Sequence, residues 1–184
     1  MPIRSSPARR CRGFTLVELV AGLAIVAGLL GLGVPTYARF LEEQRLLGDA
    51  RRLSEAILLA RSEAIKRNGV VILCAVAPPD GCGDADRWHE GWMAFEDLDG
   101  NGIPDAGDRL VPAAEPAGRP GVTIVGNAPV ERYLRFTYAG SARLASGALQ
   151  MGTFTVCKPG LRGYRVVLAH SGRTRIERLA APCP

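Results

Sequence analysis

One apolar stretch limits what this chain of 184 residues can fold into. From Leu19 to Val34 no residue has a polar side chain, and between Phe14 and Val34 only Glu18 is charged. As a helix such a run reaches across or nearly across a bilayer, and it is too long for a buried strand. Four arginines and no acid precede it: Arg4, Arg9, Arg10 and Arg12. Because basic flanks stay in the cytoplasm, the sequence predicts a single-pass protein whose later residues lie on the opposite side.

A secretory signal peptide does not explain this order of parts, because such a peptide is cut after its apolar region, beside small residues. Residues 13–18 instead resemble the type IV prepilin signal, with Gly13 before the cut, Phe14 after it and Glu18 as the fifth mature residue. Pro35 matches the position at which pilin helices often kink. The resemblance implies that prepilin peptidase cuts between Gly13 and Phe14 and that the new Phe14 amine is methylated.

Glu18 is the one charge within the apolar stretch. A carboxylate at the centre of a membrane helix costs about 2.5–3.5 kcal/mol and usually marks function. In pilins the equivalent Glu faces the Phe amine of a neighbouring subunit, and such a pair offsets burial only when its partner is present. The resemblance therefore implies that Glu18 drives assembly. The alternative is a Glu near the headgroups without a role.

Beyond Pro35 the helical pattern becomes amphipathic. Apolar residues follow the spacing of one helix face: Leu46, Ala50, Leu53, Ile57, Ala60 and Ala64. Asn68-Gly69 predicts the end of the helix. We expect a cleaved leader at 1–13, a helix at 14–68 that spans the membrane over 14–34 and is amphipathic over 35–68, and one β-rich domain over 69–184.

Seven later segments carry the patterns of strands, separated by turn residues. They are 70–76, 91–96, 122–125, 133–138, 151–158, 164–170 and 173–179. One long helix followed by many strands predicts an α+β fold, with the helix packed on an antiparallel sheet. Trp92 and Phe95 are interpreted as core residues, with a stacking surface as the alternative.

The mature chain would keep four cysteines: Cys74, Cys82, Cys157 and Cys183. An even count in an exported domain indicates disulfides, with three possible connectivities. We favour Cys74–Cys82, which closes a short loop, and Cys157–Cys183, which fastens the C-terminus to a strand. A zinc site is the alternative, but no Cys-x-x-Cys is present and the chain has only two histidines.

The segment 97–108 has oxygen-bearing side chains at EF-hand loop positions 1, 3, 5, 9 and 12, with Gly at position 6. These side chains are Asp97, Asp99, Asn101, Asp105 and Asp108. The last position has Asp where EF-hands have Glu, and the flanks read as strands rather than helices. A polar turn without metal is therefore the favoured interpretation, and calcium is the alternative. No cofactor is expected.

Catalysis has little support in the sequence. His89 and His170 are the only imidazoles, and no nucleophile motif is present, so we expect no enzyme. Charge is divided along the chain: residues 80–115 contain ten acids and two arginines, whereas residues 119–184 contain ten Lys or Arg and two Glu. This division predicts an acidic and a basic side of one domain, or serves solubility alone.

The segment 164–179 predicts a hairpin that turns at Ser171-Gly172. Strand alternation puts Arg173 and Arg175 on one face and Arg178 on the other. We interpret the first two as a site for duplex DNA phosphates that is weak, sequence-independent and salt-sensitive. Further basic residues are expected to help: Lys158, Arg162, Arg165 and Arg178. The alternative is a solvated basic face that meets an acidic neighbouring subunit.

Several motifs in order resemble the GspH/FimT family of minor pilins and pseudopilins. They are the N-terminal signal, the helix end at 60–69, the Cys74 strand, residues 88–99 and Gly172-Arg173-Thr174-Arg175. The resemblance implies a pilin-like fold, a Gram-negative inner-membrane location with a periplasmic domain, and assembly with other pilin subunits. FimT-like members carry Gly-Arg-x-Arg, which implies DNA binding in natural transformation. The alternative is a pseudopilin H at the pseudopilus tip in type II secretion, which needs no nucleic acid.

Overall fold

The structure, a computed structural model, describes residues 15–77, 81–83, 87–112 and 118–184. Its residues group into two compact units, of which the first ends at Leu41 and the second is Glu42–Pro184. The helix α1 (Leu16–Arg67) supplies residues to both. The predicted cleavage and methylation site, Gly13 and Phe14, lies outside the described residues.

Within the described part of the chain, α1 is the one helix long and apolar enough to cross a membrane. Its most apolar window of 18 residues has a mean hydropathy of 2.3, and none of that window is buried. This agrees with the membrane segment that the sequence predicts, on grounds of length and composition.

The second half of α1 forms one wall of the core of the second unit. The six residues of the predicted apolar stripe, from Leu46 to Ala64, are all fully buried, so the predicted face is confirmed. The helix ends where Asn68 adopts a left-handed conformation, with φ of 53°. The Gly69 amide then donates to the Ala64 carbonyl at 3.1 Å, which caps the last turn.

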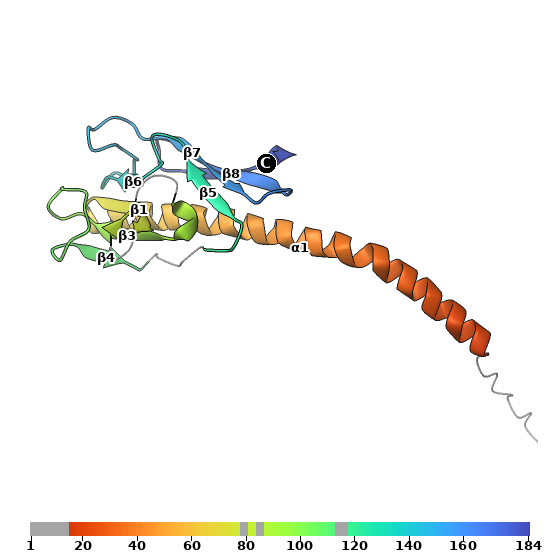
Figure 1. Cartoon of the computed structure of the whole chain (residues 1–184). Helices are drawn as coiled ribbons and strands as arrows, with labels where there is room; N and C mark the ends of the chain where they lie inside the picture. The colour runs from red at the N-terminus through yellow and green to blue at the C-terminus, as the bar shows by residue number, and fades with distance from the viewer. Residues whose placement is uncertain (1–14, 78–80, 84–86, 113–117) are drawn as a thin grey trace, which may run out of the picture. The chain divides into compact units, whose positions relative to one another are not determined.

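Two antiparallel sheets share this core with α1 (Figure 1). The first has the order β2-β1-β3-β4, and β6 also pairs with β1. Its strands are β1 (Val71–Ala77), β2 (Gly81–Cys82), β3 (Trp92–Glu96), β4 (Arg109–Val111) and β6 (Tyr133–Phe136). The second has the order β5-β7-β8-β9. Its strands are β5 (Thr123–Gly126), β7 (Gly152–Cys157), β8 (Arg162–Leu168) and β9 (Thr174–Pro182).

The α+β class and the pairing of helix with antiparallel strands agree with the prediction, but the strands divide into two sheets rather than one. The short strands β2 and β4 and the 3-10 helix η1 (Trp88–Glu90) were not predicted, because two or three residues carry no readable period. Trp92 and Phe95 are buried, which confirms their interpretation as core residues.

Candidate functional site

The hairpin of β8 and β9 carries the arginines that the sequence singled out. The two strands pair antiparallel from Tyr164 to Leu168, and a register shift separates this ladder from the pair Arg162–Pro182. Beyond the paired residues, the Ala169 amide donates to the Arg173 carbonyl and the Gly172 amide donates to the Ala169 carbonyl, both at 2.9 Å. The chain thus turns at residues 170–172, as predicted.

Gly172 is held tightly against the rest of the domain. Its φ is 75°, and a Cβ added there would lie 2.5 Å from the Gly140 carbonyl oxygen and 2.7 Å from the Arg61 Cδ. The Arg61 Nε donates to that same Gly140 oxygen at 2.8 Å. Helix α1 and the turn at 140 therefore fix the hairpin tip, and only glycine fits at this position.

Three arginines lie on the outer face of the second sheet. Arg175 pairs with Val167 and Glu177 pairs with Arg165, while the alternate residues Val166 and Leu168 are buried. Side chains alternate along a strand, so Arg165, Arg175 and Arg173 share the face turned away from the core. All three are exposed.

The three arginines on this face differ in their partners. The Arg175 Nε donates to the Glu177 Oε1 at 2.6 Å, so its charge is already compensated. Within the described chain, neither Arg165 nor Arg173 forms an ion pair or side-chain hydrogen bond. The exposed Arg162, next to a register shift at the start of β8, also has none. These three guanidiniums therefore face solvent without an ion-pair partner among the described residues.

Two of the expected DNA-binding residues do not belong to this face. The Lys158 ammonium donates to Glu42, and Arg178 pairs with Glu43 of α1. The hydrogen bond from Lys158 lowers the pKa of the Glu42 carboxyl. Both cations are engaged by helix carboxylates on the core side of the sheet, so the six predicted residues do not form one surface.

The structure contains the two disulfides favoured from the sequence. Cys74–Cys82 joins β1 to β2 with a Cα–Cα distance of 5.5 Å, and residues 78–80 of the loop between them lie outside the described residues. Cys157–Cys183 joins the end of β7 to the C-terminus at 5.7 Å. This second bond fastens the far end of β9, so the sheet that carries the arginines is fixed at both ends of its last strand.

Glu18 has a local partner that sequence reasoning missed. Its Oε2 accepts hydrogen bonds from the Thr15 amide and the Thr15 hydroxyl, both at 2.9 Å. The Glu18 amide donates to the Thr15 hydroxyl oxygen at 3.3 Å in return. This reciprocal pair is a capping box at the start of α1, and the Thr-x-x-Glu spacing was readable in the sequence.

The acidic loop 97–108 connects β3 to β4 rather than two helices, in line with the strand flanks that the sequence predicts. Carboxylate oxygens of Asp97, Asp99 and Asp108 lie within 4.8 Å of one another. Asn101 and Asp105 are exposed and hydrogen-bonded to each other at 3.1 Å. The structure thus gathers in one loop the five side chains that the spacing grouped.

Glu42 and Glu43 are the residues that sequence reasoning could not connect to the site. They are 116 and 135 residues away from the cations that they neutralise. No local motif indicates such a pairing. The same holds for Arg61 and Gly140, which support the hairpin tip from two distant segments.

Comparison with known proteins gives two family matches. The family described as type II transport protein GspH matches residues 49–172, and the prokaryotic N-terminal methylation motif matches residues 8–32. The pilin-like protein PilA1 of Thermus thermophilus is 37% identical over 101 residues, which are 54% of this chain and 56% of that protein. The match thus spans little more than half of that relative.

Solved structures similar to this one include those of a minor pilin and a minor pseudopilin. The type IV minor pilin FimU of Pseudomonas aeruginosa has a TM-score of 0.54 at 22% identity, over 77% of this chain and 98% of that one. The minor pseudopilin EpsH from the type 2 secretion system of Vibrio cholerae has a TM-score of 0.47 at 14% identity, over 72% and 95% of the two chains. The likeness to FimU shows a shared fold.

Proposed function

The chain belongs to the GspH family and is therefore a minor pilin or pseudopilin, and we propose that it assembles into a type IV pilus and there binds double-stranded DNA without sequence preference. The observation that carries the proposal is the exposed guanidiniums of Arg165 and Arg173 on the outer face of the second sheet, which form no ion pair within the described chain. In this role the protein serves DNA uptake in natural transformation.

The spacing of the arginines suits a duplex. Arg165 lies opposite Glu177, whereas Arg173 lies beside Ala169, four residues farther along the hairpin. At strand rise this separates the two backbone positions by about 13 Å. The major groove is about 12 Å wide, so the two side chains can reach phosphates on either side of it. Such contacts hold DNA without reading its bases.

Arg175 contributes less than the sequence suggested. It is already paired with Glu177, so it must leave that carboxylate before it can neutralise a phosphate. Exposed ion pairs of this kind contribute about 0–1 kcal/mol, so Arg175 loses little free energy when it exchanges Glu177 for a DNA phosphate. We therefore assign the main contacts to Arg165 and Arg173, with Arg162 and Arg175 as helpers.

Filament assembly rests on the N-terminus. We propose that prepilin peptidase removes residues 1–13, that the Phe14 amine is methylated and that the apolar half of α1 holds the subunit in the inner membrane with its domain in the periplasm. Glu18 Oε2 is used by the capping box, while Oε1 has no hydrogen bond within the described chain. That oxygen remains for the Phe14 amine of a neighbouring subunit, where a close pair offsets the cost of burial.

The test of DNA binding measures affinity of the purified full chain for a duplex of random sequence at several salt concentrations. Arg165→Ala with Arg173→Ala should weaken binding and reduce the slope of log affinity against log salt by about 1.8, if each arginine neutralises one phosphate. Arg178→Gln is the matched control, because it removes one cation from the core side of the same sheet. Equal slopes in wild type and the double variant would refute the proposed surface.

The second candidate is a structural pseudopilin of type II secretion. It is favoured by the description of the matched family as a type II transport protein. In that reading the outer-face arginines meet an acidic surface of a neighbouring subunit, and DNA plays no part. Absence of DNA affinity in the wild-type chain at low salt, with the fold intact, would make this the leading function.

A further inference from the structure

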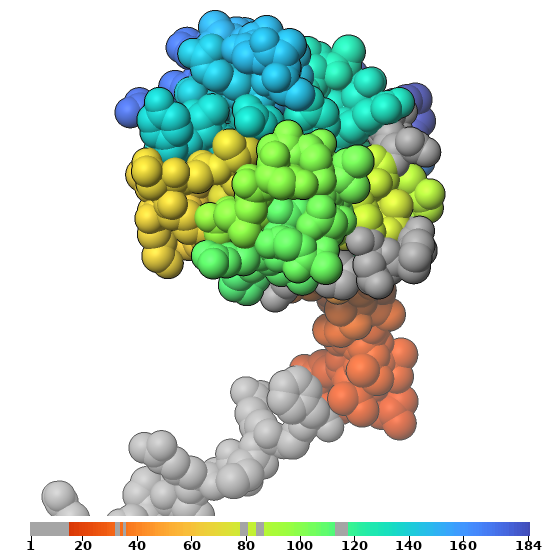
Figure 2. All heavy atoms as spheres, turned by 90° about the vertical axis from the view of Figure 1, so that its left-hand side faces the viewer, coloured from red at the N-terminus to blue at the C-terminus, as the bar shows by residue number. Residues whose placement is uncertain are grey.

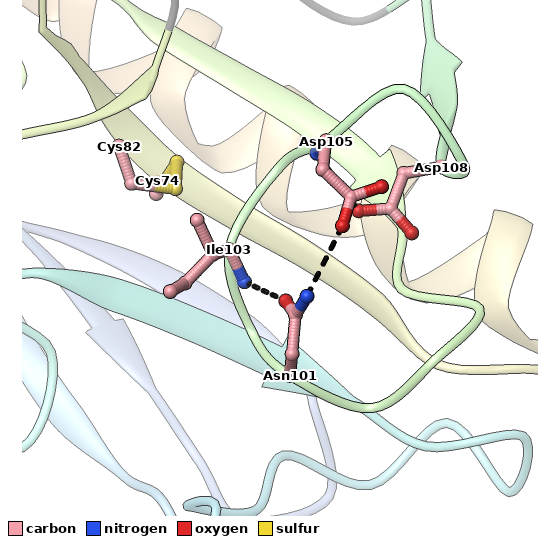
Figure 3. The surroundings of a disulfide bond; sticks show 6 residues. All are labelled: Cys74, Cys82, Asn101, Ile103, Asp105 and Asp108. Carbon is pink, nitrogen blue, oxygen red and sulfur yellow. Dashed lines mark hydrogen bonds between the residues drawn. A yellow bond between two sulfur atoms is a disulfide. The ribbon is translucent and has the colours of Figure 1, made fainter.

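The loop 97–108 between β3 and β4 contains a charge arrangement that filament assembly and DNA binding do not use. The loop lies at the surface of the domain, as the green segment in Figure 2 shows. Three of its polar side chains converge: Figure 3 shows Asn101, Asp105 and Asp108 pointing toward one another across the loop, near the Cys74–Cys82 disulfide.

Three carboxylates converge inside this loop. The oxygens of Asp97, Asp99 and Asp108 lie within 4.8 Å of one another, and Asp105 is hydrogen-bonded through Asn101 to the same group. Like charges at such distances repel, and the repulsion grows as water is excluded. Among the described residues no Lys or Arg forms an ion pair with any of these four carboxylates. The loop thus gathers negative charge without a compensating cation.

The lack of a compensating cation matters most at Asp97, because this carboxylate is buried. The residue is only 6% exposed, and its Oδ2 is buried without a hydrogen-bond partner among the residues that the structure describes. Its other oxygen, Oδ1, accepts from the Gly100 amide at 2.9 Å. Native proteins rarely leave a buried carboxylate oxygen unsatisfied, because its desolvation costs free energy that nothing returns. A metal ion bound among the three carboxylates would supply the missing partner.

We propose that this loop binds one calcium ion through Asp97, Asp99 and Asp108. Further oxygens are available from Asn101, Asp105 and the Ile103 carbonyl, which together complete loop positions 1, 3, 5, 7, 9 and 12. Calcium takes six to eight oxygen ligands in flexible geometry. A loop that offers only oxygen ligands therefore suits calcium, whereas soft metals prefer sulfur ligands.

Asn101 bridges two of the loop's carboxylates, those of Asp99 and Asp105. Its Nδ2 donates to the Asp99 Oδ2 at 2.7 Å and to the Asp105 Oδ2 at 3.1 Å, while its Oδ1 accepts from the Ile103 amide. The amide hydrogens thus bridge these two carboxylates, whose other oxygens accept from the Asn101 and Gly107 backbone amides. Rotation of the amide by half a turn would present Oδ1 to the same place, as calcium binding requires.

The backbone of the loop already has the turn and the end-to-end contacts that a bound metal ion would need. Gly102, at position 6, has a φ of 76°, which permits the sharp turn needed there. Asp108 accepts from the Leu98 amide through Oδ1 and from the Asp105 amide through Oδ2, at 3.0 and 3.2 Å. These hydrogen bonds hold Asp108, at loop position 12, close to the start of the loop, although its side chain is shorter than that of the Glu usual there. Since Asp is poorly suited to bidentate binding, we expect a Kd on the order of 10⁻⁴ to 10⁻³ M, as in extracellular calcium modules.

The test is a calorimetric titration of CaCl₂ into the full chain in detergent, stripped beforehand with a chelator, together with thermal unfolding. Binding with one site per chain and a rise in Tm are expected, since calcium at about a hundred times Kd shifts the folding equilibrium about a hundredfold. Asp99→Asn keeps the size and the acceptor oxygen of an exposed ligand, and should weaken binding at least tenfold. Glu55→Gln, which removes an exposed acid from α1, is the matched control and should bind as wild type does.

Three results would overturn the proposal. The first is wild-type protein that takes up no calcium and keeps its Tm at 10⁻² M CaCl₂, about ten times the weakest Kd expected. The second is wild-type affinity in a folded Asp99→Asn variant. The third is an equal rise in Tm with MgCl₂, because general screening of the carboxylates would then explain the effect. These outcomes are independent of DNA binding and of filament assembly.

Discussion

Replacement of Gly172 by alanine tests how the hairpin tip is held. The added Cβ would lie 2.5 Å from the Gly140 oxygen, 2.7 Å from the Arg61 Cδ and 2.8 Å from the Arg61 Nε. It would therefore enter the hydrogen bond between Arg61 and Gly140, which is 2.8 Å long. Neither the backbone oxygen nor the bonded guanidinium can move aside without loss of that contact.

The expected loss of stability in Gly172→Ala is the sum of two free-energy costs. Alanine at a φ of 75° costs about 1–2 kcal/mol, because its Cβ approaches the following carbonyl oxygen. Forcing a methyl group into occupied space typically costs a further ~1–3 kcal/mol. Gly172→Ala should therefore lower the free energy of unfolding by about 2–5 kcal/mol. Gly147→Ala isolates the first cost, since Gly147 has a φ of 84° and nothing within 4 Å of its added Cβ.

Both variants would be measured by equilibrium urea unfolding of the full chain in detergent, with disulfides intact. The fluorescence of Trp88 and Trp92 reports the transition, because both indoles are buried. Gly172→Ala should lose at least 1 kcal/mol more than Gly147→Ala, the lower limit of the overpacking cost. Equal losses would refute the reasoning, because the close approach to Arg61 and Gly140 would then carry no energy.

Two further predictions concern the N-terminus. Mass spectrometry of membrane-extracted protein should show a chain that begins at Phe14 with one added methyl group; an intact leader, or a cut near Ala38, would contradict the prepilin reading. Glu18→Ala should leave the protein in the membrane, because its apolar segment is unchanged, but should reduce its recovery in sheared filaments at least tenfold. Normal recovery would show that Glu18 is not needed for assembly, and its role would then be the capping box alone.

Local sequence patterns were sufficient to predict the helix, most of the strands and the hairpin. The stripe from Leu46 to Ala64 has the 3.6-residue period of one helix face, and all six of its residues are buried. Gly172 marked the turn because glycine adopts positive φ readily. Cys74 and Cys82 are 8 residues apart, so the short loop between them already favoured that bond. Each of these signals lies within one element or between two successive ones.

The sequence by itself therefore determined the long apolar helix, the class of fold and the position of the arginines at a hairpin. Only the tertiary structure decided which charges remain free. Glu42 and Glu43 neutralise Lys158 and Arg178 because α1 packs beneath the second sheet. That pairing depends on contacts between segments more than a hundred residues apart, on which no local period reports. Burial of Asp97 is decided in the same way, since packing around the loop, not the spacing of its acids, removes water from that carboxylate.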